Sequence, residues 1–341
     1  MIGQNIFNDV FNGNLKSIFK EKEDSNRYHR FEKIKRFLLK DDFNGFTSDD
    51  LFIMQFIKKG WGQDIAALSN MAEALVNLSI KNPNDSQYHD LIDAVVMRAL
   101  HSKVSPYKKD IENVSSLGKF GYYLEHLNII LGCYQRIAGT RYLELNERIS
   151  RHLLKNSLYY DNFHADLLPN VNMKWSADQA AIIYSIWLFD MNNSTHLSYE
   201  LSEKWLSYMN ANRRHKKTGL FQTEVLGTRK YSSQPRGCST AYLIHYMARF
   251  HPEEAQNQWD LFKNHMMIHV MGNTGFREYL KEYKGSWTPD SGPIVKGVGI
   301  AATGLALNAA SSVGDIKTYN KLNRGMEMVY DIIKRGNLIP G

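Results

Sequence analysis

Residues 275–302 read GFREYLKEYKGSWTPDSGPIVKGVGIAA, a polar loop with aromatic and charged side chains that runs into a helix of small residues. The same order occurs three times earlier in the chain, in residues 119–131, 174–186 and 236–247. In each case a loop with charged and aromatic residues precedes an apolar segment rich in Ala, Gly and Ser. Four such loops before four similar helices predict a ring of helices with one shared, functional mouth.

Helical periodicity extends through almost the whole chain and groups the segments in pairs. The predicted pairs are 22–40 with 47–59, 63–81 with 85–102, 118–138 with 140–157, 176–191 with 197–212, 237–250 with 253–270, and 294–312 with 315–335. Pro252 and Gly314 fall between the two helices of their pairs, where helix stops and starts are expected. Residues 219–227 suggest a short β-hairpin within a loop.

Six helical pairs predict an all-α protein with the (α/α)6 toroid fold, in which the first helix of each pair lines the inside and the second packs outside. A helical solenoid is the alternative fold, but the repeats share no consensus and their loops vary in length. The loops before the first helices, 158–175, 213–236 and 271–293, are long, and long loops grouped at one end of a scaffold are usually functional. We divide the chain into an N-terminal basic extension, 1–46, whose helix packs on the ring, and a toroidal catalytic domain, 47–341.

The chain of 341 residues carries a formal net charge of +7, and the positive charge is concentrated in residues 16–40 and 213–217. Neither segment contains a nucleic-acid-binding motif, so we expect solvated helix faces and loops rather than a nucleic-acid partner. A basic rim that attracts an anionic substrate or lipid is the alternative interpretation.

Several sequence signals of other protein classes are missing. The two cysteines form no CxxC pattern, so no metal site is expected. No P-loop, GxGxxG after a strand, HExxH or Gly-x-Ser-x-Gly occurs, and no cofactor is expected. The first residues lack the pattern of a signal peptide, and the apolar run 294–313 is interrupted by Lys296 and Asn308. We therefore expect a cytoplasmic protein without a transmembrane segment, with a small-molecule substrate as its partner and with homo-oligomer formation left open.

Residues 123–135, which read YLEHLNIILGCYQ, resemble the linalool dehydratase-isomerase family. The other matching segments are Gly139, 141–142, 180–190, 239–242, 277–278, Asp290 and 297–315. The resemblance covers roughly residues 118–320, in matching order. It implies an (α/α)6 toroid that adds or removes water at an allylic alcohol by acid–base chemistry without a metal. It also places the family's histidine on His126, its acidic loop position on Asp290 and a pocket tyrosine on Cys238, whereas the pocket cysteines of the family have no counterpart.

Three residues are candidates for moving protons, namely His126, Asp178 and Asp290. An imidazole can accept or donate a proton near neutral pH, so His126 in the first turns of an inner helix suits acid–base catalysis. The alternative is a buried histidine that is hydrogen-bonded to a neighbouring loop. Asp178 and Asp290 each lie near the start of an inner helix, where a carboxylate also serves as a cap. In a toroid both would point into one mouth, where carboxylates in different environments can divide into an acid and a base.

The candidates for substrate binding are Arg236, Cys238, Tyr123, Trp175, Tyr242, Glu278 and Trp287. Arg236 can hold a carboxylate or phosphate with two parallel hydrogen bonds, or form a salt bridge with Asp178 or Asp290. The neighbouring residues Arg277 and Glu278 are more typical of a pair that organises the loop than of a pair that takes part in a reaction. Cys238 fits either a buried packing residue or a thiolate whose pKa the helix N-terminus and a nearby Arg lower. The aromatic residues can stack on sugars, line an apolar pocket or stabilise a cation.

These observations predict a cofactor-independent lyase or isomerase that acts by acid–base chemistry on a small, partly apolar, hydroxylated substrate. A carbohydrate-active hydrolase or lyase with paired carboxylates on the same toroid is the first alternative, and it should have a long open groove. A non-catalytic toroid that binds an anionic partner through the basic segments is the second, and its binding should depend strongly on salt.

Overall fold

The computed structural model describes residues 24–40, 63–107, 110–226, 233–270, 272–283, 285–286, 288 and 290–334. The predicted helix 47–59, the boundary expected at residue 46 and the binding candidate Trp287 lie outside these residues. Contacts between residues divide the chain into two compact units. Among the described residues, unit 2 contains those within Ile34–Arg214 and Gln222–Gln234. Unit 1 contains those before Ile34 and those within His215–Phe221 and Pro235–Gly341.

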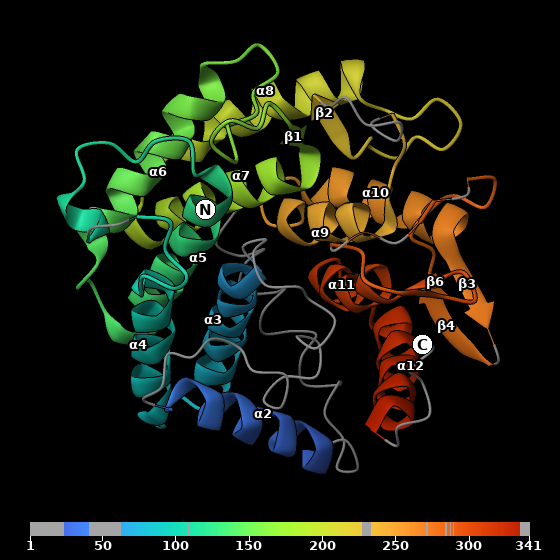
Figure 1. Cartoon of the computed structure of the whole chain (residues 1–341), viewed down its shortest axis with the longest axis horizontal. Helices are drawn as coiled ribbons and strands as arrows, with labels where there is room; N and C mark the ends of the chain where they lie inside the picture. Colours follow the sequence, from blue (N-terminus) through green and yellow to red (C-terminus); the bar gives the residue numbers. More distant parts are fainter. Residues whose placement is uncertain are drawn as a thin grey trace. The chain divides into compact units, whose positions relative to one another are not determined.

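Helices form most of the described chain, which confirms the all-α class (Figure 1). The helices are α2 (Asp24–Leu38), α3 (Gln63–Lys81), α4 (Gln87–Leu100), the short 3-10 helix η2 (Ile111–Asn113), α5 (Gly121–Ala138), α6 (Leu143–Leu158), α7 (Ser176–Asn193), α8 (Leu197–Asn212), α9 (Gly237–Met247), α10 (Pro252–Met266), α11 (Ile300–Ser312) and α12 (Ile316–Lys334). From residue 63 onward each predicted helical pair is present, with ends that differ by a few residues. The larger differences are that residues 294–299 precede α11 instead of starting it, and that α10 ends at Met266.

Short two-stranded antiparallel sheets flank the helices. The strands are β1 (Lys174–Trp175), β2 (Glu224–Leu226), β3 (Met267–Val270), β4 (Asn273–Phe276), β5 (Ile294–Val295) and β6 (Val298–Gly299). Each sheet pairs one odd-numbered strand with the next even-numbered one. The predicted hairpin within residues 219–227 is therefore wrong in its partner, because β2 pairs with β1, the segment directly before α7. Because β2 has only three residues and its partner lies about 50 residues earlier in the chain, local sequence does not determine this pairing.

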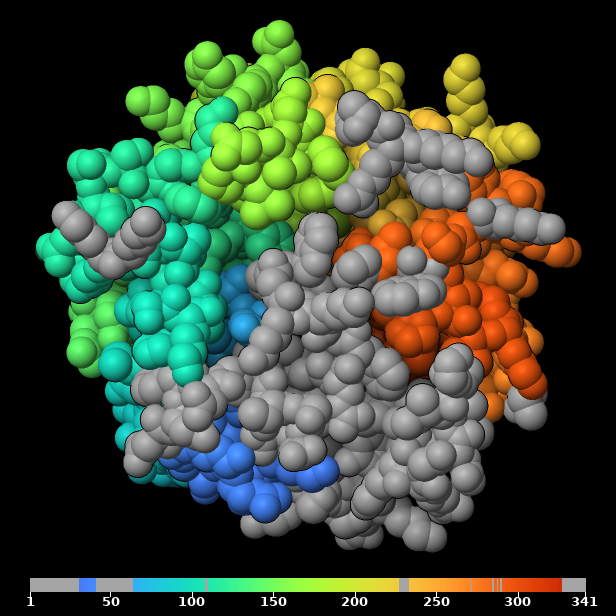
Figure 2. Space-filling model, in the orientation of Figure 1, coloured from blue at the N-terminus to red at the C-terminus, as the bar shows by residue number. Residues whose placement is uncertain are grey.

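Helix α5 forms the centre of unit 2. It contacts α3, α4, α6 and α7, and all its residues from Tyr123 to Tyr134 are buried. Helices α6 and α8, by contrast, bury only part of their surface. The first helices of successive pairs, α3, α5 and α7, are thus neighbours, and each second helix packs beside its own first helix. Figure 2 shows side chains of residues 110–175 on one face of the molecule.

A buried polar network holds α5 against α6 and α7. Asn128 Nδ2 donates to Ser150 Oγ of α6 at 2.9 Å and to Ser185 Oγ of α7 at 3.1 Å. Asn146 Nδ2 of α6 donates to Asn128 Oδ1 at 2.6 Å. All four side chains are buried, so these bonds form where an unpaired amide or hydroxyl would cost about 1–3 kcal/mol.

In unit 1, α9 lies against α11, α10 packs on α9, and α12 packs on α11 and β4. Small residues allow α9 and α11 to approach, since a Cβ at Gly237 would lie 2.8 Å from the Cβ of Ala302. An aromatic core of Trp259, Phe262 and Phe276 supports this layer, with the ring centroids of Phe262 and Phe276 4.2 Å apart. Burial of side chains of this size contributes about 1.5–3 kcal/mol each to stability.

The starts of α5, α7 and α9 share one backbone arrangement. The hydrogen bonds are Gly121 N to Asp166 O (3.1 Å), Ser176 N to Thr223 O (3.1 Å) and Gly237 N to Glu278 O (2.9 Å). In each case the acceptor carbonyl lies in the loop that precedes the next first helix, and the side chain of the N-cap residue does not cap the helix. The loop carbonyls therefore satisfy N–H groups that a helix leaves unpaired in its first turn. Each of these three loops is tied in this way to the first helix of the preceding pair.

Candidate functional site

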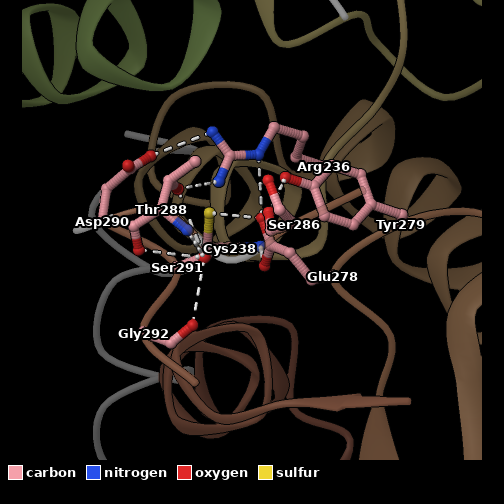
Figure 3. Close-up of polar contacts among 9 residues, drawn as sticks. All are labelled: Arg236, Cys238, Glu278, Tyr279, Ser286, Thr288, Asp290, Ser291 and Gly292. Carbon is pink, nitrogen blue, oxygen red and sulfur yellow. Dashed lines mark hydrogen bonds and ion pairs between the residues drawn. The ribbon is translucent and has the colours of Figure 1, made fainter. Parts of the chain in front are cut away.

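Unit 1 contains a polar cluster around Arg236, which Figure 3 shows. Arg236 directly precedes α9, Cys238 is the second residue of that helix, and Glu278 follows β4. The bond from Gly237 N to Glu278 O brings the two segments side by side. Glycine is needed at position 237, because any Cβ there would overlap the carbonyl oxygen of Arg277.

Arg236 uses both edges of its guanidinium group. Its Nε donates to Glu278 Oε1 at 2.9 Å, its Nη1 to Asp290 Oδ2 at 3.0 Å, and its Nη2 to Thr288 Oγ1 at 2.7 Å. The guanidinium carbon also lies 5.6 Å from the centroid of the Tyr279 ring. Arg236 forms a salt bridge with Asp290, which is one of the two interpretations that the sequence allowed for this arginine. Glu278 forms its salt bridge with Arg236 and not with Arg277, its neighbour in sequence, as far as the described residues show.

Burial is the main influence on the pKa values of Glu278 and Cys238 in this cluster. Burial raises the pKa of Glu278, although the charge of Arg236 and hydrogen bonds from Cys238 act in the opposite direction. Cys238 Sγ donates to Glu278 Oε1 at 3.1 Å, and its backbone N donates to Oε2 at 3.2 Å. Burial, together with the charge of Glu278, raises the pKa of the Cys238 thiol well above its ordinary value. The thiolate interpretation of Cys238 is therefore wrong, and the thiol is a buried hydrogen-bond donor.

The two carboxylates bound to Arg236 differ in exposure. The Glu278 side chain is 0% exposed, whereas that of Asp290 is 58% exposed. Ser291 Oγ accepts a hydrogen bond from Thr288 N at 2.8 Å and so shapes the loop that carries Asp290. Arg236 and Glu278 form a fixed inner pair, and Asp290 is the outer partner that solvent reaches.

A second cluster, in unit 2, surrounds His126 of α5. Ser69 Oγ of α3 lies 2.7 Å from His126 Nδ1 and donates its hydrogen to Ala66 O at 3.0 Å. A hydroxyl group has one hydrogen to donate; we assign it to Ala66 O, so that Ser69 accepts from the Nδ1–H of His126. The lone pair of the neutral imidazole is then on Nε2. Burial lowers the pKa of His126 to about 3, against a smaller opposite effect of Glu73, so the ring is neutral at physiological pH.

Glu125 is the immediate neighbour of this imidazole. Its Oε1 lies 3.7 Å from His126 Nε2, and both side chains are 0% exposed. Within the described part of the chain, neither Oε1 nor Oε2 of Glu125 has a hydrogen-bond partner. Burial, together with the charge of Asp178, raises the pKa of Glu125 well above its ordinary value. An acid and a base therefore lie side by side in an apolar interior.

Two half-buried carboxylates flank this pair. Glu73 of α3 accepts a hydrogen bond from Tyr184 OH of α7 at 2.8 Å. Asp178 lies in the first turn of α7. We call Glu73, Glu125, His126 and Asp178 the acid–base cluster; its members come from the neighbouring helices α3, α5 and α7.

The predicted aromatic residues have varied surroundings. Tyr123 is a core residue, 6% exposed, whose OH donates to Ala99 O at 2.9 Å. Trp175 is half-buried at the N-cap of α7. Tyr242 is also half-buried, and its ring lies edge-on to that of Tyr246 with centroids 4.7 Å apart.

The predicted site residues therefore fall into two groups. Arg236, Cys238, Glu278 and Asp290 meet in unit 1, and His126 and Asp178 belong to the acid–base cluster of unit 2. The sequence interpretation missed Ser69, Glu73, Glu125 and Thr288. Glu125 had a signal, since it is the one acidic residue in the apolar segment 121–135, where a charge must be paired or neutralised. Ser69 and Glu73 lie in an ordinary amphipathic helix and had none.

Comparison of the sequence with protein-family models finds no match, and neither does a search of curated proteins. In residues whose placement is described, no helix is both long enough and apolar enough to cross a membrane. The same residues include no group of three or more His, Cys, Asp or Glu side chains that could hold a metal ion. The functional argument therefore depends on the geometry of the two clusters, and the expected cytoplasmic location stays a prediction.

Proposed function

We propose that the protein is an acid–base enzyme, a lyase or isomerase that acts on a small, partly apolar, hydroxylated substrate. The observation that carries the proposal is the fixed orientation of the His126 ring, whose Nδ1 is held by Ser69 Oγ at 2.7 Å, and we assign the lone pair to Nε2. A neutral imidazole with one defined tautomer is what a general base requires. The resemblance of residues 118–320 to linalool dehydratase-isomerase favours an allylic alcohol as the substrate.

In the proposed reaction, His126 accepts a proton from the carbon next to the one that bears the hydroxyl group. The hydroxyl leaves as water after it is protonated, and the reverse sequence adds water. Asp178 is the second carboxylate of the site. Asp290 and Arg236 meet in unit 1 and take no part in the reaction proposed for the acid–base cluster.

We also propose that the helical pairs close into an (α/α)6 toroid. Within unit 2 the first helices α3, α5 and α7 follow one another as neighbours, and within unit 1 α9 lies against α11, which supports a ring of first helices. In a closed ring the first and last helical pairs are adjacent, whereas a solenoid separates them. Cysteines introduced on these two pairs should therefore form a disulfide in a toroid and remain reduced in a solenoid.

The test of the function compares His126→Gln and Ser69→Ala with the wild type on a panel of terpenoid alcohols, with alkene and isomeric alcohol products measured by gas chromatography. Loss of a general acid or base typically lowers the rate by about 10²–10⁴-fold, and we expect a loss of this size for His126→Gln. Ser69→Ala should give a smaller loss, because the ring remains but its tautomer and direction are no longer fixed.

The chain contains a matched control in unit 1. His245 is also buried, and its Nδ1 lies 2.7 Å from Ser312 Oγ, so it repeats the pairing of His126 with Ser69. His245→Gln should therefore retain activity after correction for the folded fraction. Equal losses in the two histidine variants would show a structural effect, and full activity of His126→Gln would exclude His126 as the base. If no alcohol in the panel is converted, the substrate class is wrong.

A further inference from the structure

The buried carboxyl group of Glu125 is the most unusual polar group among the described residues. Its side chain is 0% exposed, and neither oxygen has a hydrogen-bond partner within the part of the chain that the structure describes. Its nearest ionisable neighbour is the neutral ring of His126, with 3.7 Å between Oε1 and Nε2. The other charge that acts on it is the carboxylate of Asp178, which is of the same sign.

Beside the neutral His126 ring, an ionised carboxylate here would have neither a cation nor a hydrogen-bond donor, among the described residues, to replace the water it loses on burial. Such a charge is so costly in an apolar interior that the group binds a proton instead. Asp178 lies in the first turn of α7, where the helix N-terminus stabilises a negative charge. That charge raises the pKa of Glu125 further and so disfavours its ionisation. Glu125 is therefore an un-ionised carboxylic acid, and its O–H is a hydrogen-bond donor within the acid–base cluster.

We propose that Glu125 is the proton donor of this cluster and that its O–H binds the oxygen atom of an uncharged ligand, an alcohol or a carbonyl compound. This inference rests on the proposed function and specifies its acid and its ligand class. An anionic ligand would meet the carboxylates of Glu73 and Asp178. A cationic ligand would have to leave water and ionise Glu125, and both steps are unfavourable at a fully buried group.

The proton balance of a dehydration follows from these two side chains. Glu125 gives its proton to the hydroxyl oxygen of the substrate, the C–O bond breaks, and water leaves. His126 Nε2 takes a proton from the neighbouring carbon, whose C–H electrons form the double bond. The imidazolium then returns this proton to the Glu125 carboxylate across the 3.7 Å that separates Nε2 from Oε1, and both groups regain their starting state.

Infrared difference spectroscopy tests the protonation state without an activity assay. The C=O stretch of an un-ionised carboxyl lies above the amide I band, well separated from the bands of a carboxylate. We expect the wild-type minus Glu125→Gln spectrum at neutral pH to contain this C=O band. Glu278→Gln is the matched control, since Glu278 is just as buried but is paired with Arg236, and its difference spectrum should contain carboxylate bands. Carboxylate bands for Glu125 would overturn the proposal.

Circular dichroism first establishes that Glu125→Gln is folded. If it is not, folded wild-type protein with ¹³C-labelled glutamate reports the same C=O band, and the Glu278→Gln variant with the same label removes the competing contribution. Absence of an un-ionised glutamate band in that protein would again overturn the proposal.

The ligand class is tested with allyl alcohol and with acrylate, the anion of similar size. Allyl alcohol should shift the Glu125 C=O band of the wild type to lower frequency, because the acid then donates a hydrogen bond, and acrylate should leave it unchanged. A band that does not respond to the alcohol, or that responds equally to acrylate, would contradict the ligand class. An ionised Glu125 in an enzyme that still requires His126 for dehydration would refute this inference and leave the proposed function in place.

Discussion

The two carboxylate partners of Arg236 differ in exposure, and this difference decides how much each ion pair contributes to stability. We expect Arg236→Ala to lower the free energy of unfolding by about 3–5 kcal/mol, because Glu278 would remain buried without its cation. Asp290→Asn should change it by at most about 1 kcal/mol, since that end of the pair is exposed to solvent. Urea unfolding monitored by circular dichroism measures both values.

The double variant Arg236→Ala with Glu278→Gln provides the control, because it removes the buried charge together with its partner. It should be less destabilised than Arg236→Ala alone. Equal stabilities of the single and double variants would mean that Glu278 is protonated in the absence of Arg236 at no cost.

The side chains of the two clusters could be predicted only in part. The sequence predicts Asp178 or Asp290 as the partner of Arg236, because each lies near the start of the first helix of a pair. The partnership of Arg236 with Glu278 depends on the hydrogen bond between Gly237 N and Glu278 O, and local sequence contains no information about that contact. For the same reason, the pairing of His126 with Ser69 could not be anticipated.

Two glycines in helices show how packing decides the effect of one methyl group. A Cβ at Gly237 would overlap the Arg277 carbonyl and approach the Cβ of Ala302, whereas a Cβ at Gly304 of α11 would meet no atom within 4 Å. Gly237→Ala should therefore destabilise the protein by about 1–3 kcal/mol. Gly304→Ala should stabilise it by about 0.5–1 kcal/mol, because alanine is the better helix former. Thermal and urea unfolding of both variants measure whether each one gains or loses stability. Equal losses of stability in the two variants would contradict the packing described for α9.

The start of α12 gives the protein a defined sensitivity to acid. Burial alone would raise the pKa of Asp315, but hydrogen bonds from Thr318, Trp259 and Lys263 outweigh it and lower the pKa to about 2, from an ordinary value of 3.8. Because the folded-state pKa is the lower one, the stabilisation is present above about pH 4 and is lost as the pH falls to about 2. Urea unfolding across this range should show a steeper loss of stability in the wild type than in Asp315→Asn, and parallel curves would contradict the assignment.

The helices could be predicted because their signals are local. Apolar spacing, Pro252 and Gly314 set the pairs, and the structure reproduces them to within a few residues. Strands β5 and β6 were missed because residues 294–299 continue the apolar, small-residue pattern of α11. Strands of two residues have no periodicity of their own, and their pairing depends on contacts made elsewhere in the chain.

The path of the whole chain makes neither unit a continuous stretch of sequence. After Arg214 the chain contributes His215–Phe221 to unit 1 and then Gln222–Gln234 to unit 2. Gln258 of α10 holds the first of these segments, since its Oε1 accepts from Phe221 N at 3.0 Å and its Nε2 donates to Gly219 O at 3.2 Å. A fully buried side chain thus binds the segment at two backbone groups.

We expect Gln258→Leu to destabilise the protein by about 1–3 kcal/mol for each backbone group that it leaves unpaired. The Phe221 amide should also exchange its hydrogen faster. Gln256→Leu on the exposed side of the same helix is the control and should change neither quantity. Hydrogen exchange and urea unfolding of the two variants measure the difference, and unchanged exchange at Phe221 in Gln258→Leu would show that other contacts hold the segment.

The backbone arrangement at the starts of α5, α7 and α9 also determines how the scaffold tolerates loop engineering. A grafted loop must keep one carbonyl, that of Asp166, Thr223 or Glu278, in its present place, or it removes a cap from the helix of the preceding pair. The neighbouring carbonyls of Leu167 and Gln222 must also stay, because they accept from Tyr122 N at 3.1 Å and from Ser176 Oγ at 2.9 Å. A combinatorial library that retains these backbone positions should therefore keep the starts of the three helices capped while other loop positions vary.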